Sequence, residues 1–541
     1  MRTAESLQEE EEERMEVEVD VDVEDEDEEQ IHKLRSKATE LLLREEYKDS
    51  IQAYTQIISL CREIIFRKSP EAAIVAKLQK TLCLAFSNRA EARARLQEST
   101  LALIDCEEAL RIENSHFKAL LCKGKIFLSL NGYGMAMECF KSANLAANGN
   151  SDVVNSLLEK CKRFESLSRT GAFDVSDWVL NGFHGRVPEL AEFVSSVEIK
   201  KSGISGRGMF ATKNIESGAL LVVTKAVAVE RAIVMPQDSG KDAQLVIWKN
   251  FIEKVTESAT KCSMVRDWLA KLSSGEDDEE GKEVPDIRSF NPEAIIDVFD
   301  KNLDKGRLVS ILDVNSILEN AVSSKVLGKN ADYEGVGLWI LPSFINHSCD
   351  PNVRRVHIGD HVVVHASRNV KAGEELTFAY FDVLCPLNRR REMATNWGFV
   401  CECRRCKFEE DLLCKQEMRE IEAAMGDLVY RLEEGMRKWM IRGKKKGYLR
   451  ASFWEAYSEL YGCEKMVRKW GRKVPSVESV VDSVVDAVGS DERIVCIFME
   501  GLKRGGVVNG VVEMEKAMKF WRGVYGKVMK KQAMRTLIDS I

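Results

Sequence analysis

The sequence predicts a multidomain α+β protein with an α-helical front, a β-rich centre and an all-α C-terminal part. From Ile31 onward, small and aromatic residues recur in a helical register. Between residues 197 and 382, short apolar runs are separated by glycines, as in strands joined by tight turns. After residue 409, tryptophans, leucines and valines return to three- and four-residue spacing. At 541 residues, the chain is also too long for a single hydrophobic core.

The charge of the chain is unevenly distributed. Residues 1–30 hold sixteen acidic residues against two arginines, although the net charge of the whole chain is only −8. The remainder is therefore mildly basic, and we expect residues 1–30 to be a disordered acidic tail. No long apolar run and no basic-then-apolar N-terminus is present, so we expect neither a membrane span nor a secretory signal. Fifteen mostly isolated cysteines fit a reducing compartment, the nucleus and/or the cytoplasm.

Residues 31–165 contain three copies of one packing pattern. The third copy has small and aromatic residues at Gly124, Phe127, Tyr133, Ala136, Phe140 and Ala143. The corresponding positions 34 residues upstream are Ala90, Arg93, Ser99, Ala102, Cys106 and Ala109. A further 52 residues upstream they are Ala38, Leu41, Tyr47, Ser50, Tyr54 and Ile57, and the extra length fits longer helices around residues 61–80. The pattern resembles tetratricopeptide repeats, which implies a domain that binds a protein partner.

The centre of the chain is organised as interrupted β structure. Residues 166–196 read as a linker, and the β pattern then fills 197–382. Residues 231–332 within it look helical and contain an acidic break at 273–286, which we interpret as a surface loop inside a helical insertion. The last part, 409–541, is predicted to be a domain of packed helices.

The most informative stretch is LPSFINHSCDPN, residues 341–352. The strand-like segment HVVVHA (361–366) follows it, and then ELTFAY (375–380). Residues 401–406, CECRRC, supply three cysteines, one fewer than a tetrahedral metal site needs. Cys349 is the natural fourth ligand. A closed set of four thiolates selects zinc and leaves no open position for catalysis, so we expect a structural zinc ion held by Cys349, Cys401, Cys403 and Cys406.

Together these motifs resemble the SET domain of protein-lysine methyltransferases. The residues that carry the resemblance are GRGMFA (206–211), NHSCDPN (346–352), ELTFAYFD (375–382) and CECRRC (401–406). The layout is most similar to the SET-and-MYND branch, with a helical insertion, a post-SET zinc segment at 383–408 and a helical C-terminus. That branch carries a MYND zinc finger in the insertion, but residues 231–332 contain only Cys262 and no histidine. MYND-type partner binding is therefore not expected.

The resemblance implies a set of site residues. Tyr380 would be the catalytic tyrosine. The methyl donor S-adenosylmethionine would lie against Ser205, Gly206, Arg207, Gly208, Asn346, His347, Tyr380 and Phe399. The channel for the substrate lysine would be lined by Phe378, Phe381 and Trp397. The implied function is lysine methylation of a histone or another protein, with the repeats recruiting partners.

Two other interpretations remain open at this point. In the first, the chain is a tetratricopeptide scaffold whose SET domain is weakly active or inactive. The cysteines may instead be read as a zinc ribbon that binds nucleic acid, but a second CxxC pair and a focused basic stripe are missing, so no sequence-specific nucleic-acid binding is expected. The basic clusters 389–391 and 404–405 are interpreted as solvated surface.

Overall fold

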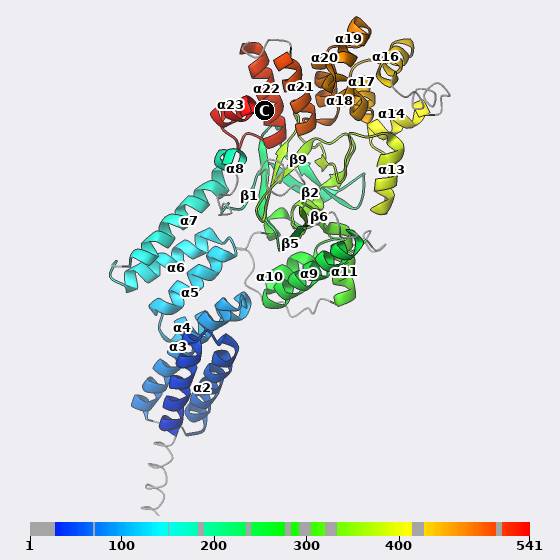
Figure 1. The fold of residues 1–541 in the computed structure, drawn as a ribbon. Coiled ribbons are helices and arrows are strands. Elements are labelled where there is room, and N and C mark those ends of the chain that lie inside the picture. Colours follow the sequence, from blue (N-terminus) through cyan, green and yellow to red (C-terminus); the bar gives the residue numbers. More distant parts are fainter. Residues whose placement is uncertain are drawn as a thin grey trace, which may run out of the picture. The chain divides into compact units, whose positions relative to one another are not determined.

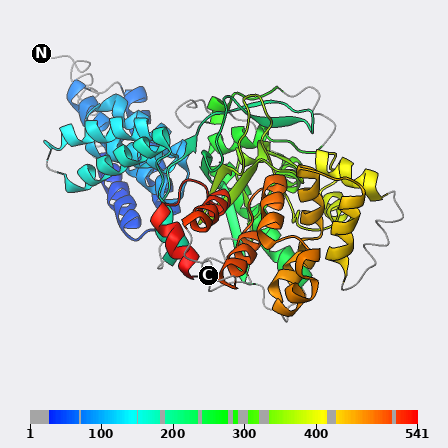
Figure 2. The same ribbon diagram turned by 90° about the horizontal axis from the view of Figure 1, so that it is seen from above.

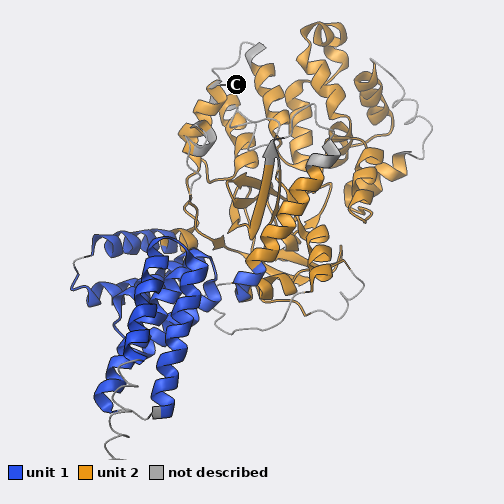
Figure 3. Cartoon of the chain, turned by 60° about the horizontal axis from the view of Figure 1, so that its bottom comes forward, with its two compact units in different colours: residues 1–165, 259–264, 291–300 blue, residues 166–258, 265–290, 301–541 orange. Residues whose placement is uncertain are grey.

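The computed structural model describes residues 27–68, 71–149, 151–181, 189–233, 240–275, 283–290, 304–319, 333–413, 427–504 and 511–540. Figure 3 shows their division into two compact units. Of the described residues, unit 1 holds those up to residue 165 and a short piece at 259–264, and unit 2 holds the others. Most of the predicted acidic tail lies outside the described residues, although residues 27–30 belong to a helix over 27–43. No helix in the described part of the chain is both long and apolar enough to cross a membrane.

Unit 1 is a series of helices in which consecutive members pack as antiparallel pairs (Figure 1). Its helices are α2 (Tyr47–Lys68), α3 (Ala72–Arg95), α4 (Ser99–Ile112), α5 (Phe117–Ser129), α6 (Tyr133–Ala146) and α7 (Asp152–Thr170). Helices α2 and α3 have 22 and 24 residues, against 13 or 14 in the next three. The prediction of lengthened helices around residues 61–80 is confirmed.

The repeat positions form the core of this unit. The following are fully enclosed: Ala38, Ser50, Tyr54, Ile57, Ala90, Ala102, Cys106, Ala109, Ala136, Phe140 and Ala143. A Cβ atom added to Gly124 would lie 2.5 Å from the ring of Phe140, closer than carbon atoms can approach. A glycine on one helix therefore admits the aromatic ring of the next, which is the small-and-aromatic packing that the sequence predicts.

The centre of unit 2 is an antiparallel four-stranded sheet in the order β1-β4-β10-β9. Its strands are β1 (Phe193–Val194), β4 (Leu220–Lys225), β9 (Val353–Ile358) and β10 (His361–Ala366). All six residues of β10 are buried, because β10 lies between two strands and is covered on both faces. The predicted strand at 361–366 is confirmed.

Smaller sheets complete the β structure. They are the hairpin β2 (Val197–Lys201) with β3 (Arg207–Ala211), the sheet of β5 (Ala228–Ile233), β7 (Tyr333–Leu338) and β6 (Ile317–Leu318), and the parallel pair β8 (Asn346–His347) with β11 (Thr377–Phe378). The parallel pair matters most for function, because it brings the NHSCDPN loop beside the ELTFAY segment.

The range 231–332 is helical over α9 (Gly240–Lys261), α10 (Ser263–Ala270), η2 (Ile287–Phe290) and α11 (Lys305–Asn315). It begins within β5 and contains β6, since the inserted segment leaves the sheet and returns to it as strands. The predicted linker at 166–196 likewise contains the end of α7, helix α8 (Ser176–Asn181) and β1. The domain boundaries set from the sequence otherwise stay predictions.

The C-terminal part is all helical. Its helices are α13 (Leu387–Asn396), α14 (Arg404–Leu413), α16 (Leu428–Lys438), α17 (Lys444–Ser452), α18 (Trp454–Gly462), α19 (Glu464–Trp470), η5 (Gly471–Lys473), α20 (Val477–Val488), α21 (Glu492–Arg504), α22 (Val511–Tyr525) and α23 (Lys531–Ser540). The later helices lie alongside the central sheet (Figure 2). The ring of His365 in β10 is 3.2 Å from the carbonyl oxygen of Gly523 in α22.

Candidate functional site

The four cysteines singled out by the sequence come together in unit 2. The sulfur atoms of Cys349, Cys401, Cys403 and Cys406 all lie within 4.8 Å of one another. Cys349 and Cys406 are buried, and the other two are half-buried. The thiols perturb one another: the pKa of Cys403 is lowered to about 7, chiefly by its hydrogen bond with Cys349. Thiols that share protons in this way are ready to bind a cation as thiolates.

Two buried arginines support the cysteine cluster. Arg390 and Arg405 are at most 1% exposed, and both pair with Glu409, at 2.7 and 2.8 Å. Arg390 also lies 3.9 Å from the sulfur of Cys406, and Arg405 donates to the carbonyl oxygen of Cys349 at 3.2 Å. The interpretation of these two residues as solvated surface is therefore wrong. They face the cluster because helices α14 and α17 enclose them with Glu409 and Ser452 as partners.

The donor set fits zinc. Four thiolates each about 2.3 Å from an ion would lie at mutual distances of the kind seen here. A site with four thiolates carries net negative charge, and the guanidinium of Arg390 beside Cys406 offsets part of it. The four cysteines would hold the ion and join the segment 401–406 to the NHSCDPN loop, as a structural site does.

Asn346, the first residue of β8, lies at the centre of a second polar cluster. Its amide nitrogen lies 3.1 Å from the hydroxyl of Ser202 and 2.8 Å from a carboxylate oxygen of Glu375. The same amide lies 3.2 and 3.3 Å from the carbonyl oxygens of Ser205 and Arg207. The structure therefore brings the predicted residues 205–208 and Asn346 together. The amide nitrogen has only two hydrogens, so these four acceptors compete for them. We call the amide of Asn346 and these four oxygen atoms the Asn346 floor.

Ser202 and Glu375 complete this floor, and sequence reasoning missed both. The Ser202 hydroxyl donates to Glu375 at 2.7 Å. A Cβ atom at Gly208 would lie 2.3 Å from the same carboxylate oxygen, so a side chain there would displace the Glu375 carboxylate from the floor. Glu375 was visible in the sequence as the acid that opens ELTFAY, but nothing local indicated that it faces the glycine-rich turn.

His347 connects two parts of the site. Its Nδ1 atom accepts the backbone N–H of Tyr380 at 3.0 Å, so the ring proton resides on Nε2. That Nε2 atom lies 3.3 Å from the sulfur of Cys349, to which it donates. The ring stacks on Phe381 at 4.4 Å between centroids and contacts Phe399 at 5.3 Å. His347 thus fixes the main chain at residue 380 relative to the cysteine cluster.

Tyr380 lies in an aromatic cage. Its ring centroid is 5.4 Å from Phe378, 5.3 Å from Trp397 and 6.0 Å from Phe399. The hydroxyl donates to the carbonyl oxygen of Ile345 at 3.0 Å, which aims it at the residue before the Asn346 floor. Burial raises the pKa of Tyr380 to about 12, so the phenol stays protonated near neutral pH.

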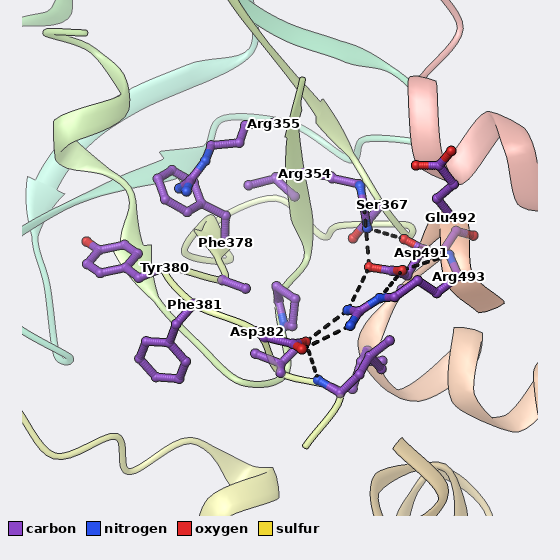
Figure 4. A pocket seen from close by; sticks show the side chains of 18 of the residues that line it. Arg354, Arg355, Ser367, Phe378, Tyr380, Phe381, Asp382, Asp491, Glu492 and Arg493 are labelled. Atoms are coloured by element: carbon purple, nitrogen blue, oxygen red, sulfur yellow. Dashed lines mark hydrogen bonds and ion pairs between the residues drawn. The ribbon is translucent and has the colours of Figure 1, made fainter. Parts of the chain in front are cut away.

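A cavity of about 440 Å³, the Tyr380 pocket, opens beside this cage (Figure 4). Phe378, Tyr380 and Phe381 line one side, and the loop that precedes α21 lines the other with residues 488–493. Trp397 contacts Tyr380 but is not among the lining residues. The C-terminal helical part therefore forms a wall of the pocket, as a substrate cleft between two parts of one unit requires.

The side chain of Arg207 points away from the Asn346 floor. The guanidinium of Arg207 donates to the carbonyl oxygen of Lys271 at 2.7 Å and lies over the ring of Phe344. It therefore points toward the end of α10, whereas its main chain faces Asn346. Arg207 contributes its backbone to the floor described above.

Known proteins are similar to parts of this chain. The SET domain family model matches residues 206–381. A "Methyltransferase" of Gibberella zeae is 25% identical over 82% of this chain and 64% of its own length. "Histone-lysine N-methyltransferase SMYD3" of Mus musculus is 27% identical over 34% of this chain and 41% of its own. The chain thus spans less than two thirds of the length of these relatives.

A structural similarity involves the N-terminal helices. The crystal structure of the Sgt2 TPR domain from Aspergillus fumigatus is 26% identical, with a TM-score of 0.22, over 26% of this chain and 83% of that one. The paired packing in unit 1, described above, is what supports the repeats. Residues 206–381 thus match the SET domain family, tetratricopeptide-like helical pairs precede them, and the chain is similar to a histone-lysine N-methyltransferase.

Proposed function

We propose that this protein is an S-adenosylmethionine-dependent protein-lysine N-methyltransferase. The observation that carries the proposal is the placement of the Tyr380 hydroxyl, caged by aromatic rings, between the Asn346 floor and the Tyr380 pocket. The names of the relatives, which include histone-lysine methyltransferases, support the same reaction. A histone and another protein are both possible substrates.

The chemistry required is modest. When bound, S-adenosylmethionine supplies a methyl group already activated by its sulfonium. The residues proposed to hold the donor are the backbone of 205–208, Asn346, His347, Tyr380 and Phe399, of which the Asn346 floor offers polar atoms and the aromatic rings offer stacking surface. The four cysteines would hold a structural zinc ion and keep the segment that carries Phe399 in place.

The lysine nucleophile must lose its proton. A free lysine has a pKa of about 10.4, so making it neutral at pH 7 costs about 4.6 kcal/mol. The aromatic walls at Phe378 and Phe381 disfavour the ammonium form and reduce this cost. Tyr380 remains protonated and is therefore no base; its hydroxyl orients the amine and the methyl group.

A methyl-transfer assay with labelled donor tests the proposal. Tyr380→Phe keeps the ring and removes only the hydroxyl, and we expect transfer to fall by about 100-fold or more, as for loss of one transition-state contact. Tyr430→Phe is the matched control, because Tyr430 stacks on Trp470 in the C-terminal helices and the replacement keeps that stacking. Equal activity of Tyr380→Phe and wild type would refute the assignment, and an inactive wild type would favour the scaffold interpretation.

We further propose that unit 1 recruits a protein partner or the substrate itself. The series of paired helices leaves an extended surface, which is how repeat proteins bind partners. The compartment proposed is the nucleus and/or the cytoplasm. Adding separate repeat fragment as a competitor should inhibit methylation of a folded substrate but not of a short peptide, if the repeats select the substrate.

A further inference from the structure

The Tyr380 pocket contains a buried arginine that the proposed reaction does not use. Arg355 lies on β9 and is 7% exposed. Its guanidinium carbon is 4.5 Å from the ring centroid of Phe378. Figure 4 shows the two side chains next to each other. Because Phe378 in turn contacts Tyr380, a single aromatic ring separates this positive charge from the proposed catalytic phenol.

The guanidinium of Arg355 has no hydrogen-bond or ion-pair partner among the residues that the structure describes, and its Nε atom is enclosed without an acceptor. The other two arginines of the pocket are paired. Arg354 lies 3.5 Å from Asp491. Arg493 bonds Asp382 at 2.9 Å and Asp491 at 3.0 Å. The carboxylates of Asp382 and Asp491 are thus already engaged, and Arg355 alone of these three arginines has its donors unused.

An unpaired buried guanidinium is unfavourable. Transfer of a charge out of water costs several kcal/mol unless an opposite charge or hydrogen bonds replace the lost hydration. The contact with the Phe378 ring offsets only part of this cost, because the ring offers no hydrogen-bond acceptor in its plane for the N–H groups. Burial lowers the pKa of Arg355 to about 10, with Arg354 adding to the effect, so the group still carries its charge at neutral pH. A residue with such a penalty at the wall of a pocket is typical of a group that a ligand completes.

We propose that Arg355 binds a carboxylate of the substrate protein, on an aspartate or glutamate close in sequence to the lysine that enters the Tyr380 pocket. The inference rests on the proposed function and adds a substrate class to it. The planar guanidinium carries five N–H donors and matches a carboxylate in a two-point contact. Asp382 and Asp491, held by other arginines, would not compete for it.

The test uses the full-length protein and lysine-centred peptides in pairs. Within a pair, one peptide has glutamate and the other has glutamine at the same position beside the lysine. A separate pair is made for each flanking position. We expect kcat/KM to be at least about tenfold higher for glutamate at one or two positions, since a charged pair in a buried site is worth more than 1.4 kcal/mol. Arg355→Met should abolish the preference and Arg355→Lys should keep part of it. Arg391→Met, at an exposed arginine of α13, should leave it unchanged.

Peptide binding is measured in parallel by fluorescence anisotropy in the Tyr380→Phe background, so that the result does not depend on catalysis. If methyl transfer is absent but glutamate peptides bind better and Arg355→Met removes the difference, the proposed reaction fails and the carboxylate site stands. Equal use and binding of both peptide members by the wild type would overturn the inference. Equal loss for both members in Arg355→Met would overturn it as well, because the charge would then act on the reaction and not on recognition.

Discussion

The two units bury different chemistry. Over residues 27–165, the buried polar side chains that the structure describes are Ser50, Ser87 and Asp105. The buried thiols there behave as small apolar groups, and burial raises the pKa of Cys61 and of Cys139 to about 11. Asp105, paired with Arg89 and Arg93, is the one charged side chain among these three. Unit 2 encloses many more charged and titratable groups, among them His347, Arg355, His357, His361, His365, Arg390, Arg405, Glu409, Glu433 and Arg450.

Because of this difference, the stability of the two units should depend on different conditions. A mostly apolar helical core depends little on moderate changes of pH, whereas a buried charge is unfavourable unless an opposite charge or hydrogen bonds compensate it. All nine tryptophans follow residue 165 and lie in ranges assigned to unit 2, so tryptophan fluorescence reports the unfolding of unit 2. Hydrogen exchange followed by mass spectrometry reports the two units separately.

Loss of the metal should have the largest effect. Cys403→Ser removes one of four ligands, and we expect the purified protein to lose one zinc ion per chain and unit 2 to be destabilised by about 5 kcal/mol or more. Elemental analysis and urea unfolding followed by tryptophan fluorescence measure the two effects. The control is Cys139→Ser in α6, which should leave the metal content unchanged. Unaltered zinc in Cys403→Ser would rule out the four-cysteine site.

Removal of a buried charge should come next. Arg390→Met leaves Glu409 with one guanidinium partner instead of two and removes the cation beside Cys406. We expect the free energy of unfolding of unit 2 to fall by about 3–5 kcal/mol with the zinc still bound, because breaking a buried pair leaves the remaining charge buried with less compensation. Arg391→Met, whose pair with Glu410 is solvent-exposed, should cost no more than about 1 kcal/mol. Similar values for both variants would contradict the role given to Arg390.

Mild acid should have the smallest effect, and only on unit 2. Burial lowers the pKa of His361 and of His365 to about 4, with Lys225 and Arg354 as the cationic neighbours that add to the effect. Below about pH 6.5 these histidines are therefore protonated in the unfolded chain but stay neutral in the folded one. The free energy of unfolding of unit 2 falls as the pH falls. Between pH 7 and 5.5 we expect about 1 kcal/mol per histidine.

Urea titrations at several pH values measure this loss. The slope of the unfolding free energy against pH reports the number of protons taken up on unfolding. In His365→Gln this number should be smaller by up to one. Hydrogen exchange in unit 1 serves as the internal comparison, where protection corrected for the intrinsic rate should change little. A loss of equal size in both units would show that buried histidines are not its cause.

The sequence predicts the cysteine site well because its chemistry is local. Three thiols within six residues leave one ligand missing, and Cys349 in the NHSCDPN loop provides it. Repeat packing is equally readable, since Gly124 and Phe140 follow from a fixed period. Strands such as 361–366 are marked by continuous apolar residues.

The missed features depend on tertiary context. Arg390 and Arg405 belong to basic runs that resemble a solvated helix face, and only Glu409 and Ser452, from α14 and α17, explain their burial. Ser202 and Glu375 lie far apart in sequence and meet only through the contact of the glycine-rich turn with Asn346. No periodicity encodes such long-range polar pairings.

The imidazole of residue 347 links the proposed metal site to the proposed catalytic tyrosine. Through it, one thiolate of the proposed metal site is connected by two hydrogen bonds to the peptide nitrogen of the tyrosine. An oxidant that attacks the sulfurs would therefore be expected to shift the phenol without reacting with it.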